Sequence, residues 1–98
     1  MRILTVKTRY LKLILARWKI QTIRKNNSYY EKIKPGDIGW VTDYRKKLKI
    51  RVTETWVKKR HELTEEDAIL DGLFSLSELM ALVPYDEVKL IRFELVSV

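Results

Sequence analysis

The turn Pro35-Gly36-Asp37 and the hairpin pattern that follows it constrain the fold more than any other stretch of this chain. Proline holds φ at about −65° and glycine accepts positive φ, so the chain must reverse or kink here. Residues 38–42 then read as a strand, residues 43–47 as a hairpin tip, and residues 48–57 as the returning strand with alternating apolar and polar side chains. The alternation breaks at Glu54, which predicts a shift in strand pairing such as a β-bulge.

The flanking sequence adds helices to this hairpin. Thr64 and Asp67 form a capping box that starts a helix, and Gly72 is suited to end that helix. Ser75 has the same capping role for a second helix, which ends before a proline. The other predicted elements are a strand over 3–7, an amphipathic helix over 9–17, an extended segment over 21–25, a polar loop over 26–28 and a strand over 87–98. We therefore expect one α+β domain over residues 1–98.

The amino-acid content excludes several classes of site. The 98 residues include no cysteine and one histidine, His61. Disulfide frameworks, thiol nucleophiles and thiolate metal sites are therefore excluded, and we expect no zinc or iron site and no cofactor. No apolar run approaches the roughly 18 residues that cross a bilayer, and no signal peptide is recognisable. We expect a cytoplasmic protein without a membrane partner and, by default, a monomer.

Charge divides the chain into a basic and an acidic part. Residues 1–61 hold 18 Lys and Arg against four acids, a net charge of +14, whereas residues 62–98 hold two against nine, a net of −7. This asymmetry favours a face that binds polyanions, and two basic runs are candidates to follow a phosphate backbone. These runs are Arg45, Lys46, Lys47 and Lys58, Lys59, Arg60. The alternatives are lysines that are merely solvated, the charge content of a thermophile, or an acidic protein partner.

The segment from Trp18 to Arg24 places a lysine, a hydroxyl and an arginine at close spacing. Such a set can hold a phosphate, a nucleobase or a polarised carbonyl. In a strand Thr22 and Arg24 share a face, but Lys19 must lie in a preceding turn to meet the hydroxyl. Trp18 is the best candidate among the three tryptophans to stack on a base. The alternative is an ordinary strand residue between solvated charges, with the tryptophans forming core or cleft wall.

Four elements in order resemble the ASCH family and span most of the chain. They are Lys19-x-x-Thr22-x-Arg24, the turn segment 33–37, the segment 63–72 and the terminal 91–94. The resemblance implies a PUA-like fold, a small mixed β-barrel with short helices packed around a cleft. It also implies recognition of RNA or a nucleoside, and some family members are amidohydrolases that remove an acyl group from modified cytidine.

The resemblance also assigns roles to particular residues. Thr22 matches the family's nucleophile and Lys19 its activating base. Asp71 matches the third member, where the family amidohydrolases have glutamate. The aspartate is one methylene shorter, which can leave a carboxylate about 1 Å short of its partner. Lys19 must be neutral to act as a base: Arg24 would lower its pKa and Asp71 would raise it, so burial decides the balance.

These observations predict an RNA- or nucleoside-binding module with a basic cleft. Lys19, Thr22 and Arg24 would line the cleft, with Trp18 and the basic runs making further nucleic-acid contacts. The alternative is an amidohydrolase that acts on N4-acetylcytidine or a related N-acylated nucleoside, with Lys19, Thr22 and Asp71 as its catalytic residues.

Overall fold

The computed structural model describes residues 2–97 and has a helix or strand where the sequence predicts each one, with bounds that differ by a few residues. Val98, the last residue of the predicted strand over 87–98, lies outside the described residues. In chain order the elements are β1 (Arg2–Thr5), α1 (Thr8–Leu15), β2 (Gln21–Lys25), α2 (Ser28–Glu31), β3 (Ile38–Thr42), β4 (Lys47–Lys59), the 3₁₀ turn η1 (Arg60–Glu62), α3 (Glu65–Leu70), α4 (Leu76–Leu82) and β5 (Glu87–Ser97). Two short elements were not expected. One is η1, and the other is α2, which stands in part of the predicted polar loop because the Asn27 side chain caps it.

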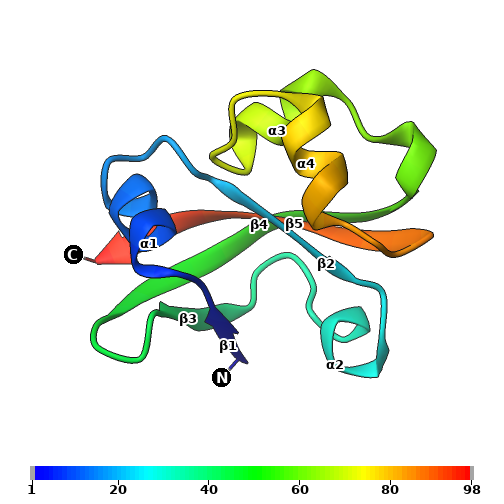
Figure 1. Cartoon of the computed structure of the whole chain (residues 1–98). Helices are drawn as coiled ribbons and strands as arrows, with labels where there is room; N and C mark the ends of the chain where they lie inside the picture. Colours follow the sequence, from blue (N-terminus) through cyan, green and yellow to red (C-terminus); the bar gives the residue numbers. More distant parts are fainter. Residues whose placement is uncertain (1, 98) are drawn as a thin grey trace.

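The strands form one curved, mixed sheet in the order β1-β3-β4-β5-β2 (Figure 1). β1 and β3 are parallel and the other neighbours are antiparallel. The register between β4 and β5 shifts between Val52 and Glu54, which confirms the predicted change in pairing at Glu54. Beyond the shift, Trp56 packs against the core beneath α3 and α4. The predicted α+β class with short flanking helices is confirmed, and the predicted mixed β-barrel is present as a curled half-barrel: within residues 2–97 no backbone ladder joins β1 to β2.

Side chains rather than a backbone ladder connect the two edge strands, β1 and β2. Tyr29 of α2 covers the edge of β1: its hydroxyl accepts from Ile3 N–H at 3.1 Å and donates to Ile3 O at 2.9 Å. Arg24 on β2 reaches across and donates from Nη2 to Thr5 O at 2.8 Å. In the described part of the chain, no backbone ladder closes the sheet between these two strands.

Two groups of buried apolar residues support this sheet. One lies beneath α1 and includes Leu11, Ile14 and Ile50, while the other lies beneath α3 and α4 and includes Ala68, Leu79 and Leu90. Strand β5 contributes to both groups, so it connects the supports of α1 and α3. The end of α1, which Lys19 follows, and the end of α3, which Asp71 caps, are thus fixed to one sheet.

Candidate functional site

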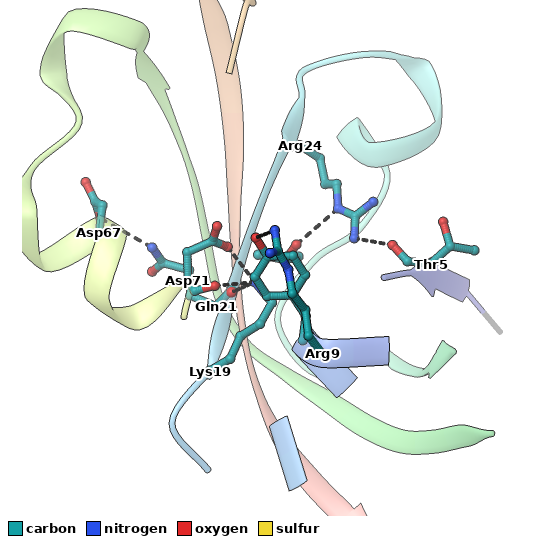
Figure 2. Close-up of polar contacts among 9 residues, drawn as sticks. Thr5, Arg9, Lys19, Gln21, Arg24, Asp67 and Asp71 are labelled. Atoms are coloured by element: carbon teal, nitrogen blue, oxygen red, sulfur yellow. Dashed lines mark hydrogen bonds and ion pairs between the residues drawn. The ribbon is translucent and has the colours of Figure 1, made fainter. Parts of the chain in front are cut away.

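A cavity of about 280 Å³ lies in the gap between β1 and β2. The cavity is lined by Lys19, Thr22, Arg24 and Asp71, together with Tyr10 of α1 and parts of β1 and α4. Figure 2 shows Lys19 and Asp71 in contact on one side and Arg24 reaching Thr5 on the other. Asp71, which is distant in the sequence, therefore shares one concave surface with the closely spaced Lys19, Thr22 and Arg24.

The turn after α1 delivers Lys19 to this cavity. α1 ends in a Schellman motif, in which the N–H groups of Arg17 and Trp18 donate to carbonyls of the last helical turn at 3.0 and 2.9 Å. Arg17 occupies the left-handed position at φ 64°, which glycine usually takes. Lys19 follows in the connection to β2, which is where the sequence required it to lie in order to approach Thr22.

Asp71 is positioned by the corresponding motif at the end of α3, where it is the C-cap residue. Gly72 follows at φ 89°, as the predicted helix-ending glycine. A methyl group on Gly72 would lie 3.1 Å from Leu13 Cδ1 and 3.3 Å from Lys19 Cβ. Glycine is therefore required both for the backbone conformation and for the close approach of α3 to the Lys19 side chain.

Lys19 and Asp71 form a buried ion pair. Lys19 Nζ donates to Asp71 Oδ1 at 2.6 Å, to Asp71 O at 2.8 Å and to Gln21 O at 2.8 Å. These three oxygens match the three donors of an ammonium group. The shorter aspartate thus reaches the lysine, because the end of α3 lies against it. The exposed fractions of the two side chains are 4% and 15%.

Burial pushes both members of the pair toward their neutral forms. Desolvation lowers the pKa of Lys19, although the Asp71 charge and hydrogen bond oppose this, and Arg24 lowers it further. Desolvation likewise raises the pKa of Asp71 against the attraction of Lys19 and Arg24. The sequence left open whether the pKa of Lys19 is raised or lowered, and the effect of burial is larger than that of Asp71.

Thr22 lies on β2 beside this pair and is 4% exposed. Arg24 Nε donates to Thr22 Oγ1 at 3.1 Å, so the two side chains share a face of the strand as expected. Among residues 2–97, the hydrogen bonds of Lys19 Nζ go to Gln21 and Asp71 and not to Thr22. The arrangement therefore presents a guanidinium and a hydroxyl on one side of the cavity and an ammonium–carboxylate pair on the other.

The other predicted contact residues lie outside the cavity. Trp18 is 74% exposed and lines a neighbouring groove. Arg45, Lys46 and Lys47 lie at the hairpin tip where β4 begins, and Lys47 Nζ is 4.7 Å from the ring centroid of Trp40. The structure thus separates these exposed residues from the four that line the cavity.

The basic run at the far end of β4 has internal partners. Lys58 Nζ donates to Asp67 Oδ2 at 2.7 Å, and Lys59 Nζ donates to Glu87 Oε2 at 2.9 Å. Arg60 donates to two carbonyls at the end of α4 at 2.7 and 2.8 Å. These cations hold β4, α3, α4 and β5 together, a role that the charge pattern did not suggest.

A buried polar network that the sequence did not reveal supports the site from below. The Gln21 side chain is fully buried. Its Nε2 donates to Asp67 Oδ1 at 3.4 Å, and its Oε1 accepts from Arg92 Nη2 at 3.1 Å. Asp67 was expected only as a capping residue, and it has this role as well. A single glutamine at the start of a strand gave no signal for the network, because its partners are distant in the sequence.

The structure also bears on metals and membranes. Within residues 2–97, no three or more histidine, cysteine or acidic side chains gather as they would around a metal ion. No helix in the same range has both the length and the apolar content to span a bilayer.

Solved structures with similar folds include an ASCH domain. The chain matches hypothetical protein PH0355 with a TM-score of 0.79, 23% identity, and coverage of 96% of this chain and 97% of that one. It matches the ASCH domain from Lactobacillus crispatus with a TM-score of 0.77, 15% identity, and coverage of 95% and 79%. It also matches protein EF3133 from Enterococcus faecalis, assigned to the family model DUF984, with a TM-score of 0.81, 17% identity, and coverage of 98% of this chain and 76% of that one.

The sequence itself matches no family model and no curated protein. The similarity lies in the fold, which is that of an ASCH domain and confirms the expectation drawn from the four sequence elements.

Proposed function

We propose that this protein is an RNA- or nucleoside-binding module whose cavity between β1 and β2 receives a nucleobase. The observation that carries the proposal is the convergence of Lys19, Thr22, Arg24 and Asp71 on one small cavity walled partly by Tyr10. A nucleobase presents donors and acceptors on its edges and an apolar face. This cavity offers charged and hydroxyl groups for the edges and an aromatic ring for the face.

We expect the phosphate contacts to fall on exposed cations outside the cavity. Arg45, Lys46 and Lys47 at the hairpin tip are exposed, and the chain carries a net charge of +7. Lys58, Lys59 and Arg60 would contribute only through donors that their internal bonds leave free. Arg24, which lines the cavity, would contact the nucleotide that occupies it.

Binding to single-stranded RNA, measured as a function of salt, tests this proposal. The logarithm of the association constant is expected to fall with the logarithm of salt concentration by about 0.7 for each phosphate neutralised. Arg24→Gln should weaken binding, whereas exposed Arg51→Gln, on the strand β4, serves as a matched control. A salt-independent affinity, or equal losses in the two variants, would contradict the proposal.

The Lys19–Asp71 pair supports a second candidate, hydrolysis of an N-acylated cytidine. If Asp71 takes a proton from Lys19, the neutral amine can accept the Thr22 proton as the hydroxyl oxygen attacks the acyl carbon. The bond between the acyl carbon and the cytidine N4 then breaks, and N4 takes a proton from Lys19. Water hydrolyses the threonine ester, which frees the carboxylic acid and restores the Thr22 hydroxyl. Arg24, which donates to Thr22 Oγ1, would orient the hydroxyl oxygen for attack and ease the loss of its proton.

Incubation with N4-acetylcytidine, followed by detection of cytidine and acetate, tests the second candidate. Thr22→Ala should abolish turnover, while Thr53→Ala, a change at an exposed threonine of β4, should leave it intact. Absence of turnover by the wild type, or equal turnover by Thr22→Ala, would reject the hydrolase while leaving the binding proposal standing.

A further inference from the structure

A second, larger groove of about 580 Å³ lies beside the cavity, between the end of α1 and the loop that joins α3 to α4. Its lining is mainly apolar and includes Trp18 and Phe74. The two rings are exposed to solvent by 74% and 93%. Exposed large aromatic side chains around one hollow mark a binding surface, since a soluble protein gains nothing in stability from displaying them.

The groove and the cavity are neighbours, because Tyr10 lines both. Two cations approach its ring from these two sites: Arg9 Cζ lies 4.8 Å from the ring centroid and Lys19 Nζ lies 5.4 Å from it. Arg9 also donates from Nη2 to the Tyr10 hydroxyl at 3.0 Å. A guanidinium group therefore stands at the boundary between an aromatic groove and a polar cavity.

We propose that the groove binds the neighbouring base of an unpaired RNA strand, stacked against Trp18 or Phe74, when a nucleoside occupies the Lys19 cavity. The inference rests on the proposed nucleoside site. Arg9 would contact the phosphate that links the two nucleotides. Stacking on aromatic rings accepts any base, so the groove would add affinity without selecting sequence.

An RNA strand fits these features better than a protein segment does. The groove and the polar cavity share the Tyr10 wall, and the Arg9 guanidinium lies beside that wall, which matches the alternation of base, phosphate and base in a strand. Of the residues that the structure describes, Glu78 in the first turn of α4 is the one acidic side chain that lines the groove. A second copy of this chain is the competing occupant of an exposed apolar groove, and the experiment below distinguishes it.

Calorimetric titration with nucleosides and dinucleotides tests the inference. The probes are cytidine and N4-acetylcytidine, each alone and as the two dinucleotides that place adenosine on its 5′ or 3′ side. One of the dinucleotides should bind roughly 5- to 150-fold more tightly than its nucleoside, the range for one stacked base. Trp18→Ala with Phe74→Ala should remove this gain and leave nucleoside affinity unchanged. Tyr44→Ala, which removes an aromatic ring that is 86% exposed elsewhere, should leave both unchanged.

The outcomes separate this inference from the function on which it rests. If no nucleoside and no dinucleotide binds, both are overturned. If a nucleoside binds and neither dinucleotide binds more tightly, the groove assignment alone is overturned. Equal losses from Tyr44→Ala would also overturn the assignment to this groove. Sedimentation offers a further test. If the wild type is a dimer and the Trp18→Ala, Phe74→Ala double variant is a monomer, the groove is a self-association surface and its assignment to RNA is overturned.

Discussion

Gly72 allows the end of α3 to approach Lys19, and its replacement by alanine tests the physical basis of the site. Gly36 is a matched control, because it has φ 93° against 89° for Gly72. A Cβ on Gly36 would meet nothing within 4 Å, whereas one on Gly72 would meet the Leu13 and Lys19 side chains at 3.1 and 3.3 Å. The two substitutions therefore share the backbone strain and differ in the collision.

The expected magnitudes follow from these two terms. A left-handed backbone costs an L-residue about 1–2 kcal/mol, and alanine recovers about 0.4–1 kcal/mol by restricting the unfolded chain. Gly36→Ala should therefore lower the free energy of unfolding by about 1 kcal/mol. Gly72→Ala adds overpacking, which costs about 1–3 kcal/mol, so its total should be about 2–4 kcal/mol.

Urea denaturation followed by circular dichroism measures both values, and nucleoside binding by the folded fraction measures the effect on the site. Gly72→Ala should also weaken nucleoside binding, since Lys19 must shift to make room, whereas Gly36→Ala should not. Equal losses of stability in the two variants, with ligand affinity preserved in both, would refute the claim that Gly72 sets the approach of α3 to Lys19.

Three further results are expected. Burial lowers the pKa of Lys19 in the folded protein. In the pH range just below about 10.4 the unfolded chain therefore binds more protons than the folded one, so the free energy of unfolding rises with pH there. Lys19→Met should flatten that rise in urea titrations across this range. Arg60→Ala should lower the free energy of unfolding by about 1.5–3 kcal/mol, because two carbonyls at the end of α4 lose a charged donor, against a change within about 0.5 kcal/mol for exposed Arg45→Ala; equal effects would contradict this role. Replacing Arg45, Lys46 and Lys47 together by glutamine should reduce the salt dependence of RNA binding by up to about 2 in the log–log slope, and an unchanged slope would remove the hairpin tip from the interface.

The local parts of the fold were predictable from sequence. The capping box at Thr64 and Asp67, the left-handed Gly72 and the pairing shift near Glu54 each depend on a few adjacent residues. Their stereochemistry is decided within a turn or a strand, so the pattern predicts them. Arg17 shows the limit of this reasoning: it takes a left-handed conformation without being glycine, and nothing in its neighbourhood signals it.

The site was predictable only in part. The family resemblance predicted Lys19, Thr22, Arg24 and Asp71 as site residues. In the structure all four line one cavity. The pKa balance of the lysine could not be settled beforehand, because it depends on burial. The internal partners of the basic run at the end of β4 were also hidden, since charge patterning does not reveal which strand or helix will lie against a given lysine.

The central claim is that the cavity between β1 and β2 binds a nucleoside. Chemical-shift mapping of the ¹⁵N-labelled protein, titrated separately with N4-acetylcytidine and cytidine, tests this claim most directly. The account predicts that the largest amide shifts fall on Thr22, Ile23, Arg24 and Asp71. Absence of shifts at these residues under saturating nucleoside, or shifts confined to the hairpin tip at residues 43–47, would contradict it.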